Sequence, residues 1–202
     1  MFFYLGNATV FLIQVVFGLF ILLTMVRFLL QLARADFYNP LSQAIVRITN
    51  PLLLPLRKII PGLWGADLAA VVLLFVLKFV ELFLIGDNRL FAGLLQLSGQ
   101  SFAHPAGLAV FAIADLLQLA IYIEMFALFV QVILSWVSPH GAYGSPVASL
   151  LYSLTEPLLR PARRILPPMG GLDLSPFVVF ILLQLTIMIL VAPIKAFAIS
   201  LL

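Results

Sequence analysis

The stretch TEPLLRPARRILP at residues 155–167 occurs twice in this chain and decides its fold. Its counterpart is TNPLLLPLRKIIP at residues 49–61, which lies 106 positions earlier. The threonine, three prolines and one arginine coincide at that single offset. An aspartate beyond the last proline also coincides, as Asp67 in the first copy and Asp173 in the second. A match of this length without a gap indicates an internal duplication.

The composition places the chain in a lipid bilayer. Of its 202 residues 64% are hydrophobic and 9% are charged, with a mean hydropathy of +1.20. A soluble domain carries roughly 25% charged residues. A membrane-spanning helix needs about 20 apolar residues. Residues 9–28, 66–85, 108–137 and 177–197 meet that need, the last interrupted late by Pro193. Since no alternating strand pattern competes, we expect an all-α membrane protein with four transmembrane helices.

The connections at residues 31–65 and 138–176 are amphipathic. Apolar residues at helical spacing within residues 41–48 recur within residues 147–154, after Asn39-Pro40 and Ser145-Pro146 starts that favour a helix. We expect each helix to end before Pro51 or Pro157, because a residue before proline is pushed out of the helical region. The sequence therefore predicts a short interfacial helix in each copy. A proline-basic piece follows, at residues 52–61 or 158–167, which either lies on the membrane or dips into it.

The positive charges indicate how the two copies are oriented. Eight of the eleven lysines and arginines lie in or beside residues 31–65 and 138–176. The positive-inside rule places both connections on the cytoplasmic side of the membrane and both termini outside. Each copy contributes two spans, so we expect parallel repeats. We predict a first repeat at residues 1–88, an outward-facing loop at 89–106 and a second repeat at 107–202.

The ordered prolines, basic residues and aspartate, with Gly-Gly-Leu-Asp-Leu-Ser-Pro at residues 170–176, resemble the YggT family of small bacterial integral membrane proteins. The resemblance covers nearly the whole chain, and the second copy matches best. The first copy departs where Ala69-Ala70 stand in place of Ser175-Pro176. The resemblance implies a multi-pass fold with links to osmotic stress and, in plastid relatives, to maturation of b-type cytochromes. It implies no catalytic residue.

The duplicated segment supplies the first candidate site. Its basic residues are Arg57, Lys58, Arg160, Arg163 and Arg164, and its prolines are Pro51, Pro55, Pro61, Pro157, Pro161 and Pro167. The cations either bind anionic lipid headgroups, at roughly 1 kcal/mol each, or bind a protein partner, or serve only as topology anchors. Asp67 and Asp173 open the following spans. Each either draws an arginine of its own copy inward or caps the helix.

The second candidate site consists of polar residues within the spans, namely Lys78, Glu81, Glu124 and Gln184. Charges at this depth cost several kcal/mol and therefore face the bundle interior. They either line a polar route for ions or staple helices together, with Lys78 pairing Glu81 or Glu124. We expect Asp115 to be solvated near the outer boundary.

Other chemistry finds little support in the sequence. The chain has no cysteine, and His104 and His140 fall in loops assigned to opposite sides of the membrane, so we expect no metal site. No phosphate-binding glycine loop, nucleophile elbow or nucleic-acid-binding pattern occurs. We therefore predict a scaffold or assembly factor without enzymatic activity or cofactor, acting on a protein partner or a second copy through its proline-basic loops. The alternative is a small ion or osmolyte conduit.

Overall fold

The computed structural model describes residues 2–62, 67–86, 105–137, 145–165 and 173–202, and these are helical apart from short connections, with no strand among them. The predicted all-α fold is thereby confirmed. The elements are α1 (Phe2–Leu32), α2 (Pro40–Ile59), α3 (Leu68–Gly86), α4 (Pro105–Val137), α5 (Pro146–Ile165), α6 (Ser175–Thr186), the π-helical turn η2 (Ile187–Val191) and α7 (Ala192–Ser200).

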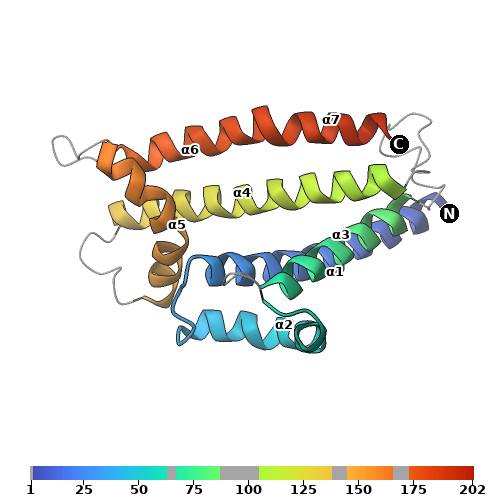
Figure 1. Cartoon of the computed structure of the whole chain (residues 1–202), viewed down its shortest axis with the longest axis horizontal. Helices are drawn as coiled ribbons and strands as arrows, with labels where there is room; N and C mark the ends of the chain where they lie inside the picture. Colours follow the sequence, from blue (N-terminus) through green and yellow to red (C-terminus); the bar gives the residue numbers. More distant parts are fainter. Residues whose placement is uncertain (1, 63–66, 87–104, 138–144, 166–172) are drawn as a thin grey trace.

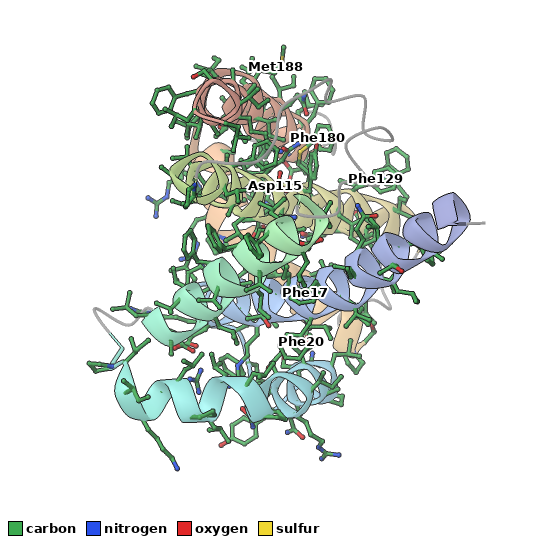
Figure 2. The ribbon with its side chains drawn as sticks, turned by 90° about the vertical axis from the view of Figure 1, so that its right-hand side faces the viewer. Phe17, Phe20, Asp115, Phe129, Phe180 and Met188 are labelled. Carbon is green, nitrogen blue, oxygen red and sulfur yellow. The ribbon has the colours of Figure 1, made fainter. Side chains whose placement is uncertain are left out.

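Four helical segments are long and apolar enough to cross a membrane, as predicted. They are Ala8–Leu32, Leu68–Ile85, Pro105–Val137 and Ser175–Ser200. Large apolar side chains cover their outer surfaces, and Figure 2 shows Phe129 and Met188 directed away from the ribbon. Such an apolar exterior suits lipid rather than water. The chain is therefore a membrane protein with several spanning helices.

The two copies run in the same direction through the bundle. In Figure 1, α1 and α4 both lead away from the end that holds the two termini, and α3 and α6 both lead back towards it. Helix α5 crosses the opposite end of the bundle, while α2 begins near that end and lies alongside α1 (Figure 1). The N-terminal ends of α2 and α5 meet, because Asn39 Nδ2 donates hydrogen bonds to Pro146 O at 2.6 Å and to Ser149 Oγ at 2.9 Å.

Equivalent leucines anchor the two proline-containing helices. Leu53 of α2 is fully buried against Ala69 and Ala70 of α3. Leu159 of α5, at the same repeat position, is fully buried against Leu128 of α4 and Val179 of α6. The largest core cluster joins the copies, since it contains residues of α1, α3, α4 and α5. Each proline helix is thus packed against its neighbouring spans.

The prediction that the amphipathic helices end before Pro51 and Pro157 is wrong. Helix α2 continues through Pro51 and Pro55, and α5 continues through Pro157 and Pro161. The four prolines lie on the exposed sides of their helices, and each leaves the carbonyl four residues earlier without its helical donor. The ring clash changes the helix direction instead: the first limb of α2 lies along the plane of Figure 1, and its second limb is seen end-on.

Pro193 does not interrupt the last span. The helix passes through it, and the turn just before it, η2, has π-helical hydrogen bonding. A proline cannot donate to the carbonyl four residues earlier, and its ring crowds that carbonyl. A π turn widens the helix at this point and accommodates the missing donor within a continuous rod.

Candidate functional site

An arginine–aspartate latch closes each copy at the same repeat positions. Arg57 at the end of α2 forms an ion pair with Asp67 in front of α3. Arg163 at the end of α5 pairs with Asp173 in front of α6, with Nε and Oδ2 2.9 Å apart. Of the two interpretations of these aspartates, the pairing of each with an arginine of its own copy is confirmed. Both latches tie a proline helix to the span that follows it.

The same aspartates also serve the helix starts. Asp67 Oδ1 accepts a hydrogen bond from Ala70 N at 3.3 Å, and Asp173 Oδ1 accepts one from Ser175 N at 2.9 Å. These bonds satisfy backbone N–H groups that the first turn leaves free. Both interpretations hold for Asp67, because one carboxylate oxygen faces Arg57 and the other accepts a hydrogen bond from the first turn of α3. For Asp173 the pairing with arginine holds, but the N-cap position of α6 is Leu174, so Asp173 lies one residue before the cap.

The second latch carries more negative charge than the first. Arg163 Nη1 also lies 2.9 Å from Glu156 Oε2, and Arg160 pairs with the same carboxylate. Burial alone would lower the pKa of Arg163, but Asp173 and Glu156 outweigh it and raise that pKa. Burial would likewise raise the pKa of Asp173, but hydrogen bonds from Ser175 and Arg163 hold it below its usual value. The pair is ionised at neutral pH.

A buried threonine receives a polar side chain from the first span of each copy. Thr49 and Thr155 are both fully buried. Arg27 Nη1 of α1 donates to Thr49 Oγ1 at 2.6 Å, and the Thr155 hydroxyl donates to Gln131 Oε1 of α4. Gln131 therefore occupies the place of Arg27, although the offset here is 104 rather than 106 residues. That shift hid the correspondence from the sequence comparison.

Arg27 borders a cavity that sequence reasoning missed. The cavity has a volume of about 670 Å³ and is lined by residues of α1, α2 and the segments next to α2, including Gln31, Arg57 and Asp67. Arg27 is only 4% exposed and makes its hydrogen bonds to Val46 O, Thr49 and Asn50. None of these partners is a carboxylate. The sequence placed Arg27 at a loop border, and nothing in its spacing marked it as buried.

The remaining cations of the duplicated segment face outward. Lys58 and Arg164, which follow the two latch arginines, are exposed and make no ion pair with any residue that the structure describes. The next residues, Ile59 and Ile165, are 79% and 80% exposed. Each proline helix therefore ends in the same exposed cation–isoleucine pair, which is equivalent in the two copies.

A second cluster of charges lies between the copies. Lys78 of α3 pairs with Glu81 Oε2 at 3.0 Å and with Asp115 Oδ2 of α4 at 2.9 Å, and Lys195 of α7 also pairs with Asp115. These four residues border a cavity of about 320 Å³, and Figure 2 shows Asp115 between α4 and α3. The expectation that Asp115 is solvated is wrong. The carboxylate instead pairs with two lysines from different helices, which gives Lys195 its partner, and Glu81 supplies the second negative charge of the cluster.

The other predicted residues lie apart from this cluster. Gln184 is exposed on α6, and Glu124 of α4 has a buried Oε2 without a hydrogen-bond partner among the described residues. Neither borders the cavity beside Lys78. Pro167, His104 and His140 lie outside the described residues. Within the described part of the chain, no group of three or more histidine, aspartate or glutamate side chains could hold a metal ion.

Comparison with known proteins agrees with the duplicated architecture. A family model described as CCB3/YggT matches residues 6–87 and 110–194. The chain belongs to the CCB3/YggT family. The two matched segments correspond to two tandem copies of the YggT unit.

Uncharacterised proteins from three bacteria are similar to most of the chain. An uncharacterised protein of Pseudomonas aeruginosa is 44% identical over 189 residues, which cover 93% of this chain and 90% of that protein. An uncharacterised protein of Vibrio alginolyticus is 42% identical over 181 residues, covering 88% and 90%. The uncharacterised protein YggT of Escherichia coli strain K12 is 34% identical over 178 residues, covering 88% and 86%. No solved structure matches the chain.

Proposed function

We propose that the chain is a non-enzymatic membrane scaffold or assembly factor. Its working surface is the docking face, which we define as two separate exposed pairs, Lys58 and Ile59 at the end of α2 and Arg164 and Ile165 at the end of α5. In this proposal the face lies on the cytoplasmic side of a bacterial inner membrane, because most lysines and arginines flank the two proline helices. The partner is a membrane protein that offers carboxylates beside an apolar contact.

One observation carries the proposal: both copies expose the same cation–isoleucine pair, while the preceding arginine is paired with an aspartate of its own copy. An exposed isoleucine beside an unpaired cation contributes nothing evident to the fold. A protein interface uses such residues, since an apolar contact supplies affinity and a charge supplies orientation. Leu53 and Leu159, both fully buried, hold each pair in a fixed position.

Crosslinking in living cells tests this proposal. A photoreactive amino acid at position 59 or 165 is expected to form one defined protein adduct, and Lys58→Gln with Arg164→Gln is expected to remove it. Position 126 serves as the matched control, because Phe126 is 66% exposed on the spanning helix α4 and is expected to give lipid adducts. Lipid adducts alone at positions 59 and 165 would contradict a protein-docking role.

A second candidate function, a small ion or osmolyte conduit, is favoured by the cavity beside Lys78, Glu81 and Asp115. Charged groups within a membrane often mark ion pathways. A simpler explanation of these ion pairs is that they only hold α3, α4 and α7 together. Solute flux in reconstituted vesicles that falls with Lys78→Leu would favour the conduit. Vesicles without flux across pH and salt conditions would leave the fastening role.

A further inference from the structure

The two copies differ in charge at one place where their geometry is otherwise alike. In the first copy, Arg27, Arg57 and Asp67 surround the cavity, and the polar neighbour of Arg27 is the neutral Asn50. In the second copy, Gln131 takes the place of Arg27 and Glu156 takes the place of Asn50. At the equivalent positions, the second copy balances Arg160 and Arg163 with Glu156 and Asp173. Around its cavity, the first copy keeps one positive charge in excess, because Asp67 is the one carboxylate beside Arg27 and Arg57 among the described lining residues.

Both arginines of the first copy retain unused donors. Arg27 makes its hydrogen bonds through Nη1 alone, and Arg57 makes its bonds through Nε and Nη2, counting the described residues. Arg27 therefore keeps Nε and Nη2, and Arg57 keeps Nη1. A buried guanidinium without a carboxylate partner is unfavourable unless an anion accompanies it. Paired arginines with free planar donors suit a phosphate group.

The position and lining of the cavity favour a lipid as the source of that phosphate. Arg27 lies five residues before the end of α1 at Leu32, which is about 8 Å along the helix axis and therefore near headgroup depth. The apolar side chains of Phe37 and Val46 line the same cavity. An arginine pair next to apolar walls matches a molecule that carries its phosphate on a hydrocarbon tail.

We propose that the first-copy cavity binds the phosphate group of an anionic phospholipid between Arg27 and Arg57, and that the second copy has no such site. This inference goes beyond the proposed scaffold role and does not depend on the docking face. It explains the excess positive charge around the first-copy cavity by a bound ligand rather than by the positive-inside rule.

Native mass spectrometry of the full chain in a nonionic detergent tests the site. The probes are dioctanoyl phosphatidylglycerol, dioctanoyl phosphatidylcholine and inorganic phosphate. We expect one phosphatidylglycerol to bind tightly. Arg27→Gln, which copies Gln131, is expected to weaken its binding at least about tenfold, the loss that corresponds to one charge-assisted hydrogen bond.

Asn50→Asp is the second variant. Asn50 Oδ1 lies 2.9 Å from Arg27 Nη1, so an aspartate at this position supplies a carboxylate partner for Arg27 and is expected to preserve the fold. We expect it to weaken phosphatidylglycerol binding as strongly as Arg27→Gln. Arg160→Gln is the matched control, since it removes an exposed cation from the second copy and should leave binding unchanged.

The arms of this experiment also distinguish the source of the phosphate. Tighter binding of phosphatidylglycerol than of inorganic phosphate supports the lipid. If phosphatidylglycerol and inorganic phosphate bind equally well, and Arg27→Gln and Asn50→Asp each abolish that binding, the site takes phosphate from the aqueous phase. Wild-type affinity in Arg27→Gln and Asn50→Asp, or a loss no larger than in Arg160→Gln, would overturn the proposal.

Discussion

Arg163 Nε lies 2.9 Å from Asp173 Oδ2, and this ion pair joins the end of α5 to the start of α6. The pair has an equivalent 106 positions earlier in Arg57 and Asp67, which joins α2 to α3. Besides the extra carboxylate of Glu156 in the second latch, the two latches differ in the burial of their aspartates. The Asp67 side chain is 5% exposed, whereas the Asp173 side chain is 36% exposed.

The difference in burial predicts unequal costs for breaking the two latches. Asp67→Asn removes a buried carboxylate that pairs with Arg57 and accepts a hydrogen bond from Ala70 N, and it is expected to lower the free energy of unfolding by about 1–3 kcal/mol. Asp173→Asn removes a solvent-exposed partner and is expected to cost less than about 1 kcal/mol. Thermal unfolding of the two variants in detergent measures both effects. Equal costs would contradict the assignment of the first latch as the buried one.

The second latch should also give the stability an acid dependence. The folded state holds the pKa of Asp173 below its unfolded value, which is about 3.9. Such a group contributes stability that is complete above the unfolded pKa and is lost as the pH falls through the folded pKa. The difference in unfolding temperature between wild type and Asp173→Asn is therefore expected to be constant from pH 7 to pH 5 and to shrink below about pH 4. If this difference in unfolding temperature grows on acidification, the ion pair does not stabilise the fold in the predicted way.

The features that could be predicted from the sequence are those that a local pattern or an exact repeat encodes. The four spans follow from hydrophobic length, the start of α2 follows from Asn39-Pro40, and the pairing of Asp67 follows from its fixed place beyond the prolines. The helix ends were missed because Pro51 and Pro157 lie on exposed faces, where a bend costs less than termination.

The charged contacts between distant elements were not encoded locally. Asp115 and Lys195 are 80 residues apart and meet only after α4 and α7 pack together. Arg27 looked like a border residue because the contact with Thr49 depends on how α2 lies along α1. Comparison of the two copies could have found Arg27 only by allowing the two-residue shift that pairs it with Gln131.

The cluster around Asp115 predicts a compensating double mutant. Asp115→Asn leaves Lys195 without its acidic partner and is expected to cost about 2–4 kcal/mol of unfolding free energy. Adding Lys195→Met removes the stranded charge and is expected to restore at least about 1 kcal/mol. Unfolding curves of the single and double variants measure the coupling. Strictly additive losses would show that the two side chains act independently.

The bend in α2 predicts a short distance between its ends. Leu41 and Ile59 are both exposed, and a straight helix would separate their Cα atoms by about 27 Å. Spin labels at these positions can be introduced cleanly because the chain has no cysteine. We expect a shorter distance in the wild-type background and a longer one in Pro51→Ala with Pro55→Ala. Identical distances in both backgrounds would mean that the prolines do not cause the bend.

The central claim is that the duplication sets both proline helices on one side of the membrane, where they present equivalent exposed pairs. Single cysteines at positions 59 and 165 test it directly, with a membrane-impermeant thiol reagent applied to intact spheroplasts and to inverted membrane vesicles. We expect both positions to react in inverted vesicles and neither to react in spheroplasts. Reaction of one position from each side would contradict the parallel arrangement and remove the shared docking face.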